Sequence, residues 1–151
     1  MVAWRFSRHA GLDGQGGLVA SGRWHTRGRR ILYCAPDPAT ALLEVLVHSA
    51  VRTPEALEGF QFLKIEIPDE IALEQVADGL LPADWTQRPE ITRDWGDRWL
   101  RGGSSAALLV RSVLVPETWN VLVNPIHQDA VRIAGLAEIP FPLDARLFTA
   151  A

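Results

Sequence analysis

The sequence predicts an α+β fold in a single compact domain that spans residues 1–151. The expected strands outnumber the expected helices and do not alternate regularly with them, which favours twisted, mostly antiparallel sheets over a doubly wound parallel sheet. A hydrophobic share of 48% with 22% charged residues is a globular balance and argues against disorder. No repeat, low-complexity tract or linker interrupts the 151 residues, a length that suits one domain.

Two short strands with a long loop between them are expected at the start of the chain. Residues 2–6 and residues 31–35 are apolar enough to be strands, and the intervening segment 11–22 is rich in glycine. Its glycines do not follow a strand and open a helix, as a dinucleotide-binding fingerprint requires. We therefore interpret this segment as a loop without a Rossmann-type site.

A helix that is apolar almost all round is expected next. Asp37 and Pro38 predict its start, because Asp is a preferred N-cap and Pro is tolerated at the first helical position, and we expect it to end near Ser49. Glu44 is the only charged side chain between Asp37 and Arg52. A lone carboxylate there must find a partner, keep a wet pocket open or shift its pKa upward. The main buried stripe is expected to consist of Ala41, Leu42, Val45 and Leu46.

Further strands and a second helix are expected in the rest of the chain. Residues 61–67 alternate between apolar and polar side chains, which predicts a half-buried strand, and residues 119–123 predict another. Residues 89–101 predict a helix that the following glycine pair ends. Three segments are less regular: 71–87, expected as a short turn of helix and a loop, 104–115, a long apolar run, and 131–151, expected to hold two edge strands.

Charge and hydrophobicity exclude several classes of function. The net charge of −3 gives neither the basic footprint of a nucleic-acid-binding protein nor a polybasic membrane patch. No apolar run approaches the ~18 residues of a membrane span, and no N-terminal segment resembles a signal peptide. A single cysteine, Cys34, rules out an internal disulfide and fits a reducing compartment. We expect a soluble, cytoplasmic protein in which Cys34 is a buried structural thiol.

Common catalytic motifs are also absent from the sequence. None of the histidines, at positions 9, 25, 48 and 127, has the paired spacing of a zinc site, so no metal is expected. No G-x-S-x-G elbow supports acyl transfer by a serine. Most of the six tryptophans are expected in the core, and Trp95 and Trp99, four residues apart, predict one packed or partner-binding helix face. Trp24 is placed at a pocket only because it follows Arg23.

An arginine, a tyrosine and a glutamate form the strongest candidate site. Arg23 lies ten residues before Tyr33, which lies eleven before Glu44, and in a loop–strand–helix unit the three can converge at the end of the strand. Arg offers a planar fork for phosphate oxygens, and Tyr offers a ring to stack on and a hydroxyl to donate. Glu can accept a hydrogen bond from a ribose hydroxyl and offset positive charge at the sugar. The same spacing fits a purely structural Arg–Glu pair equally well.

Several motifs together resemble the RES domain, the toxin half of bacterial RES–Xre type II toxin–antitoxin pairs. The segment from Gly22-Arg23-Trp24 through LYCAPDPATALLEVLVH, with the late Ser112 and the closing NVLVNP, carries the resemblance, which extends from Trp4-Arg5 to Pro125. That family is named for an Arg, a Glu and a Ser, resembles ADP-ribosyltransferases in fold, and consumes NAD. In the family a proline often precedes the serine, whereas Arg111 precedes Ser112 here.

The resemblance implies a pocket and a role for each residue in it. Arg23, with Arg5, would hold phosphates, and Tyr33 and Trp24 would position the nicotinamide or its ribose. Glu44 would act on the ribose hydroxyl and the cation left at the sugar, and Ser112 would supply a supporting hydrogen bond. Structural roles are expected for His25 and His48. NAD is then a substrate, and no metal is required.

Three functional hypotheses follow from the sequence and the resemblance. The first is an NAD-cleaving toxin, with water or phosphate as the acceptor; the second is a protein ADP-ribosyltransferase that uses the same pocket. The third is a catalytically silent partner-binding module with a structural Arg–Glu pair. The resemblance also implies an Xre-type antitoxin that covers the active site, harm to cells that express this chain alone, and no direct contact with nucleic acid. The oligomeric state stays open, a homodimer included.

Overall fold

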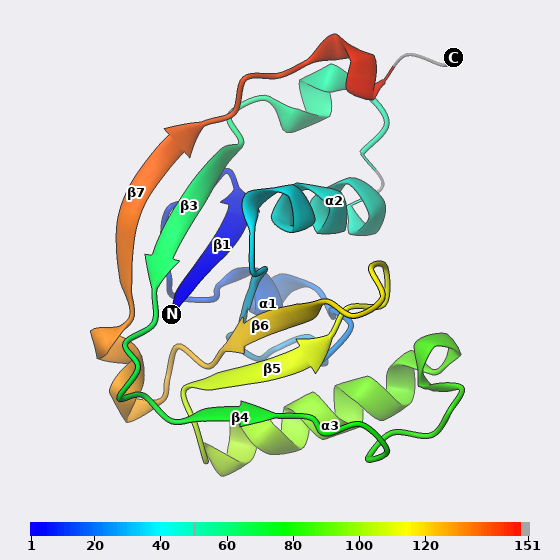
Figure 1. The fold of residues 1–151 in the computed structure, drawn as a ribbon, viewed down its shortest axis with the longest axis vertical. Helices are drawn as coiled ribbons and strands as arrows, with labels where there is room; N and C mark the ends of the chain where they lie inside the picture. Colours follow the sequence, from blue (N-terminus) through cyan, green and yellow to red (C-terminus); the bar gives the residue numbers. More distant parts are fainter. Residues whose placement is uncertain (50, 149–151) are drawn as a thin grey trace.

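Two β-sheets form the framework of the chain (Figure 1). In the computed structural model, which describes residues 1–49 and 51–148, the first sheet has the strand order β1-β3-β7 and the second β2-β6-β5-β4. Neighbouring strands are antiparallel except for the parallel pair β4 and β5. The bounds are β1 (Val2–Ser7), β2 (Leu32–Cys34), β3 (Gln61–Glu66), β4 (Leu73–Gln75), β5 (Ala107–Arg111), β6 (Trp119–Val123) and β7 (Ala134–Pro140). The predicted α+β class with mostly antiparallel sheets is confirmed.

The two sheets are joined where β1 passes the end of β2. Trp4 and Ala35 exchange two backbone hydrogen bonds there, with N···O distances of 2.8 and 2.7 Å. This short antiparallel bridge brings strands of both sheets to a single edge. Because helix α2 (Pro38–His48) begins directly after that edge, its position is tied to both sheets.

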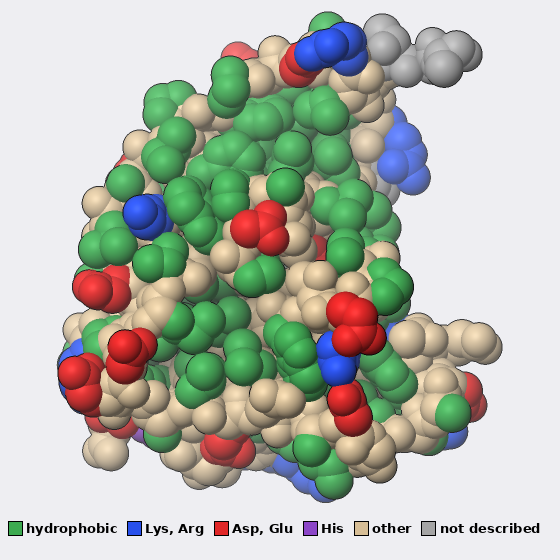
Figure 2. All heavy atoms as spheres, viewed as in Figure 1, with side chains coloured by type: hydrophobic (Ala, Val, Ile, Leu, Met, Phe, Trp, Pro, Cys, Tyr) green, Lys and Arg blue, Asp and Glu red, His purple; other side chains and the backbone are tan. Residues whose placement is uncertain are grey.

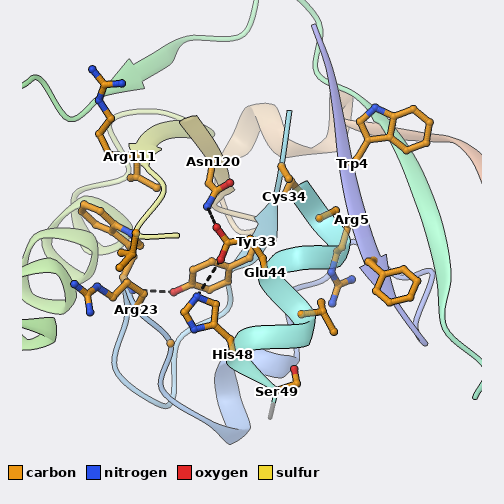
Figure 3. Close-up of a pocket in the computed structure, with 18 of the residues that line it drawn as sticks. Trp4, Arg5, Arg23, Tyr33, Cys34, Glu44, His48, Ser49, Arg111 and Asn120 are labelled. Atoms are coloured by element: carbon orange, nitrogen blue, oxygen red, sulfur yellow. Dashed lines mark hydrogen bonds and ion pairs between the residues drawn. The ribbon is translucent and has the colours of Figure 1, made fainter. Parts of the chain in front are cut away.

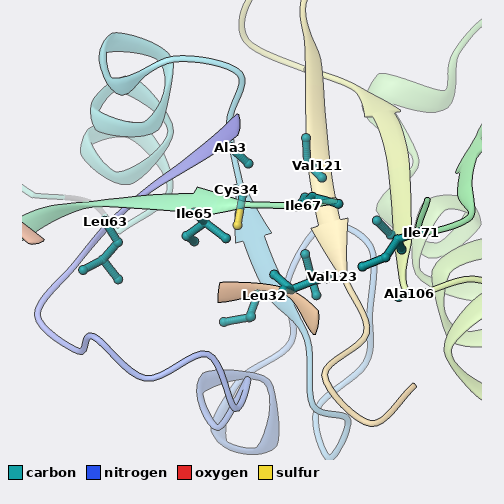
Figure 4. Close-up of a cluster of buried hydrophobic side chains, with 12 residues drawn as sticks. Ala3, Leu32, Cys34, Leu63, Ile65, Ile67, Ile71, Ala106, Val121 and Val123 are labelled. Carbon is teal, nitrogen blue, oxygen red and sulfur yellow. The ribbon is translucent and has the colours of Figure 1, made fainter. Parts of the chain in front are cut away.

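Strand alternation supplies side chains to two separate cores. On β6, Val121 and Val123 enter the cluster between the two sheets, whereas Leu122 enters the cluster under helix α3 (Pro89–Gly102). The central cluster is shown in Figure 4. On β2, Leu32 and Cys34 likewise face the central cluster, so the side chain between them, Tyr33, must face the α3 side. The predicted buried Cys34 is confirmed, and burial raises the pKa of its thiol to about 12.

Helix α2 begins as the sequence predicts but is less covered than expected. The Asp37 carboxylate accepts a hydrogen bond from the backbone N–H of Thr40 at 2.9 Å, and Pro38 occupies the first turn. The predicted stripe faces a phenylalanine-rich cluster under the first sheet, while Leu43 and Val47 are exposed. Figure 2 shows hydrophobic side chains gathered over this part of the molecule.

Helix α3 covers the outer face of the second sheet (Figure 1). Gly103, with φ of 58°, ends it in the left-handed conformation that glycine tolerates best. Trp99 is buried and its indole N–H donates to the Ser105 hydroxyl at 2.9 Å. Gly96 lies against the backbone of the loop that precedes β2, and a Cβ there would meet the Trp24 carbonyl oxygen at 1.8 Å. Glycine at this position therefore lets the loop lie directly on the helix.

Three sequence predictions about local structure need correction. The loop 11–22 contains a short helix, α1 (Gly16–Val19), and the segment 71–87 contains β4 in place of a helical turn, followed by a 3₁₀ turn at Trp85–Gln87. In the tail only one of the two expected edge strands forms, β7; the second piece is a 3₁₀ turn at Ala145–Leu147, and residues 149–151 lie outside the described residues. Other 3₁₀ turns span Pro54–Leu57 and Gln128–Arg132.

The error at β4 has a physical cause. Strand β4 has only three residues and is exposed at two of them, so its formation depends on pairing with β5 and not on a local pattern.

Within the described residues, no helix combines the length and the hydrophobicity that crossing a membrane would require.

We predict that Gly96→Ala destabilises the fold although alanine is the better helix former. The gain in helix propensity is about 1 kcal/mol, whereas overpacking against the Trp24 carbonyl costs about 1–3 kcal/mol or more. Urea unfolding measures the difference. Gly102→Ala on the same helix is the control, because a Cβ there meets nothing within 4 Å. Equal stability of the two variants would contradict the close approach.

Candidate active site

A cavity of about 420 Å³ lies at the edge where the two sheets meet (Figure 3). Its walls come from β1, β2, α2, the loop before β2, the first turns of α3 and the ends of β5 and β6. The volume is in the range of small-molecule sites, about 300–1,000 Å³. Of the predicted site residues, it brings together Arg5, Arg23, Trp24, Tyr33 and Glu44. Ser112 does not line the cavity and reaches it only through Glu44.

Three side chains from different parts of the chain hold the carboxylate of Glu44. Its Oε1 accepts hydrogen bonds from the Ser112 hydroxyl at 2.9 Å and from the Asn120 side-chain amide at 2.6 Å. Its Oε2 faces His48 Nε2 at 2.9 Å, one helical turn along α2. Figure 3 shows His48 and Asn120 on either side of the carboxylate. With two donors on Oε1 and one on Oε2, Oε2 is the oxygen with room for a ligand hydroxyl.

The charge of Glu44 is maintained in spite of its burial. Burial alone would raise the pKa of this carboxyl, but hydrogen bonds from His48, Asn120 and Ser112 outweigh burial and leave the pKa below its usual value. The same contact with Glu44 raises the pKa of His48, against the opposing effect of burial. Of the three outcomes expected for a lone helical glutamate, the structure therefore shows a partnered carboxylate beside a cavity and no upward pKa shift.

Ser112 serves to orient Glu44. Its hydroxyl oxygen accepts hydrogen bonds from the backbone N–H groups of Leu114 and Val115, both at 3.1 Å. These two donors leave the single hydroxyl hydrogen pointing at Glu44 Oε1. Because the side chain is buried behind the carboxylate, a direct contact between Ser112 and a bound ligand has no support in this geometry.

The Tyr33 hydroxyl is already fully engaged. His25 Nε2 lies 3.0 Å from the carbonyl oxygen of Ala20, which can only accept, so this nitrogen carries the hydrogen. Burial lowers the pKa of His25, which keeps the ring neutral and makes Nδ1 an acceptor. The Tyr33 hydroxyl donates to that Nδ1 at 2.8 Å and accepts from the Trp24 backbone N–H at 3.0 Å. The hydroxyl is thus not free to donate to a ligand, contrary to the prediction from the sequence, and Tyr33 offers its ring.

Arg23 does not pair with Glu44. Its Nη2 donates to the carbonyl oxygens of Trp85 and Thr86, at 2.8 and 2.5 Å, and its guanidinium lies 5.6 Å from the centre of the Trp85 ring. Its buried Nε has no hydrogen-bond partner within the described residues. The alternative of a structural Arg23–Glu44 ion pair is therefore wrong, and both charges border the cavity separately.

Packing explains the residue types on both sides of Arg23, namely Gly22 and Trp24. A Cβ on Gly22 would lie 2.5 Å from the Tyr33 hydroxyl and 2.9 Å from the His25 ring, so only glycine fits. The Trp24 side chain is 2% exposed and packs beside Trp85 with the ring centres 6.1 Å apart. Trp24 therefore supports the cavity wall and does not present an open ring face to a ligand.

Arg5 enters the cavity from β1, on the other side of Glu44 from Arg23 (Figure 3). Its Nη1 donates to the carbonyl oxygens of His9 and Gly11, at 3.4 and 3.1 Å. Burial lowers the pKa of Arg5, but a guanidinium stays charged at any ordinary pH.

Sequence reasoning missed three residues of the site. His48 was noticed as a neighbour of Glu44 on the same helix flank but was expected to be only structural. Asn120 interrupts the apolar run WNVLV of β6, and a polar residue among core positions could have identified it. Arg93 lines the cavity from α3, and nothing in its local sequence marks it. Within residues 1–49 and 51–148, no cluster of three or more histidine, cysteine, aspartate or glutamate side chains could hold a metal ion.

Comparisons with known proteins point to one family. The family model described as "RES domain" matches residues 2–144. A protein named "Toxin Res" from Pseudomonas putida is 40% identical over 148 residues, 98% of this chain and 100% of that protein. A "Prs ADP-ribosylating toxin" from Sphingobium sp. is 37% identical over 79% of this chain and 75% of its own length. The M. tuberculosis MbcT-MbcA toxin-antitoxin complex contains a chain with the same fold, with a TM-score of 0.76, 16% identity, and coverage of 97% of this chain and 86% of that one.

We predict that Tyr33→Phe lowers stability by about 1–3 kcal/mol, because it leaves the Trp24 backbone N–H without a partner and removes one of the two donors to the buried His25 Nδ1, the other being the Gly22 backbone N–H at 3.2 Å. Urea unfolding measures this loss. In a His25→Phe background the same substitution should cost less, because one of the two groups is already gone. An equal cost in both backgrounds would show that the Tyr33–His25 contact contributes nothing.

Proposed function

The chain belongs to the RES domain family, and on that premise we propose that it is the toxin of a toxin–antitoxin pair that breaks the nicotinamide–ribose bond of NAD. The observation that carries this proposal is Glu44, an ionised carboxylate that three side chains hold at the wall of a ligand-sized cavity. The names of the relatives support the toxin role, and the name of the Sphingobium relative supports chemistry on ADP-ribose.

The chemistry that NAD requires matches what this cavity offers. The nicotinamide of NAD is positively charged and leaves as a neutral molecule, so the reaction needs no strong general acid. The enzyme must instead stabilise the cation that develops at the ribose carbon. Glu44 Oε2 supplies the negative charge and accepts a hydrogen bond from a ribose hydroxyl. The Tyr33 ring offers a face for the nicotinamide or the ribose.

Preorganisation makes Glu44 more effective than a solvated carboxylate. Ser112, Asn120 and His48 fix both of its oxygens before any substrate arrives, so no reorientation is needed as charge develops. The Asn120 Oδ1 is buried without a hydrogen-bond partner in the described part of the chain. Asn120 and Ser112 are positioning residues in this proposal.

The acceptor of ADP-ribose separates two versions of the function. Water or free phosphate would make the protein an NAD glycohydrolase or phosphorylase, and we place this version first. The name of the Sphingobium relative favours the second version, transfer of ADP-ribose to a protein from the same pocket. The M. tuberculosis chain of the same fold was solved in a toxin–antitoxin complex, which supports an antitoxin partner for this chain as well. We expect that partner to be of the Xre type.

We predict that the purified chain releases nicotinamide from NAD and that Glu44→Gln lowers turnover by about 100-fold or more, because the lost charge acts mainly in the transition state. Chromatographic detection of nicotinamide, with and without phosphate, measures the reaction. Release that requires phosphate identifies a phosphorylase, and release without it a hydrolase.

Glu58→Gln is the control for that experiment, since Glu58 is an exposed carboxylate outside the cavity. If nicotinamide release is absent, labelled NAD with cell lysate tests transfer to a protein. Absence of both reactions would refute the enzymatic proposal and favour a silent partner-binding module.

We also predict opposite pH trends for activity and stability. Because contact with Glu44 raises the pKa of His48, the ion pair stabilises the fold fully below pH 6.5, and its contribution is lost as the pH rises through the raised pKa. Loss of the imidazolium charge over the same range leaves the Glu44 charge less offset, so turnover should increase. Turnover and thermal unfolding measured from pH 5 to 9 check both trends. Both should flatten in His48→Gln, and a persistent rise in turnover would assign it to another group.

A further inference from the structure

The arginines around the cavity differ in whether a carboxylate pairs with their charge. Arg111 makes a two-point contact with the Asp78 carboxylate, at 3.1 and 2.9 Å. Arg5, Arg23 and Arg93 line the same cavity and form no ion pair with a carboxylate in the described residues. The cavity wall therefore carries more positive charge than the single Glu44 carboxylate balances.

Arg93 is anchored at one edge and free at the other. Its Nε donates to the carbonyl oxygen of Gly22 at 2.9 Å, and its two terminal nitrogens make no hydrogen bond or ion pair within residues 1–49 and 51–148. The preceding residue, Thr92, donates its hydroxyl hydrogen to the carbonyl oxygen of Arg23 at 2.7 Å. Two successive residues of α3 thus hold two successive backbone carbonyls, which fixes Arg93 beside Arg23.

This arrangement places two like charges close together. Burial lowers the pKa of Arg23 most, and the positive charge of Arg93 lowers it further. Such proximity is unfavourable unless an anion lies between the guanidinium groups. Arg23 also keeps a buried Nε without a partner in the described part of the chain, so hydrogen-bond donors are present at the same place. Arg5 borders the same cavity on the other side of Glu44 in the view of Figure 3.

We propose that Arg93 and Arg23 form a two-guanidinium site for phosphate oxygens, which the diphosphate of the dinucleotide occupies. Guanidinium groups bind phosphate oxygens through paired N–H donors, and two of them match the charge of a diphosphate. The identity of the ligand at this site rests on the proposed function. It assigns Arg93 to substrate binding, while Glu44 acts on the ribose at the centre of the cavity.

Inorganic pyrophosphate tests the site without any turnover. Calorimetric titration of the full chain should show binding that Arg93→Gln weakens by about 10-fold or more, the loss expected when a charge-assisted hydrogen bond is removed. Arg93→Lys keeps the charge but not the fork and should give an intermediate affinity. Arg98→Gln is the matched control, because Arg98 lies on the same helix, pairs with Asp94 and does not line the cavity. Thermal unfolding of each variant confirms that it is folded.

Steady-state kinetics then identify the ligand of the site. In Arg93→Gln the KM for NAD should rise by about 10-fold or more, with a much smaller change in kcat. An unchanged pyrophosphate affinity and an unchanged KM for NAD in folded Arg93→Gln would overturn the proposal. A rise confined to the KM for inorganic phosphate would also overturn it, because Arg93 would then bind an acceptor phosphate. Arg93-dependent pyrophosphate binding without nicotinamide release, either alone or with cell lysate, would refute the NAD-cleaving function while the anion site stands.

Discussion

Partial burial of one carboxylate in an apolar helix is the constraint on which the site depends. Glu44 retains its charge because donors reach it from its own helix, from β6 and from the segment after β5. These donors are in place only if α2 lies across the edge where the two sheets meet, and the Trp4–Ala35 bridge fixes that edge. A local electrostatic requirement thereby couples the position of one helix to the joining of two sheets. The cavity is the space that this coupling leaves beside the carboxylate.

The second support of the site is the contact between the loop before β2 and helix α3. Gly96 allows the loop to lie on the helix, and Gly22 allows it to pass the buried Tyr33–His25 pair. The hydroxyl of Tyr33 then belongs to the scaffold, whereas its ring belongs to the cavity. The Tyr33 side chain thus has both a structural role and a role in the cavity. Arg23 lies in the same loop, which the close contacts at Gly22 and Gly96 hold in place.

Sequence reasoning succeeded where the determinants are local and failed where they are not. The Asp37 cap and the glycine end of α3 follow from backbone geometry within a few residues, and both were predictable. The resemblance to a family identified Arg23, Tyr33 and Glu44, because the three residues lie within one loop–strand–helix unit. β4, Asn120 and Arg93 gain their roles only from partners far along the chain. The engaged hydroxyl of Tyr33 could not be foreseen either, because it depends on the tautomer of His25.

The way in which Arg23 is anchored has a consequence for how such a site can diversify. Its Nη2 is held by the main-chain carbonyls of residues 85 and 86, which every amino acid provides. This contact therefore places no requirement on the side chain at position 86, whereas the close approach at Gly96 requires glycine. Apart from Trp85, whose ring packs against the guanidinium and against Trp24, this segment before α3 can accumulate substitutions while the guanidinium stays in place. A rim that is free to vary around a fixed charge is a favourable starting point for the evolution of new substrate preferences.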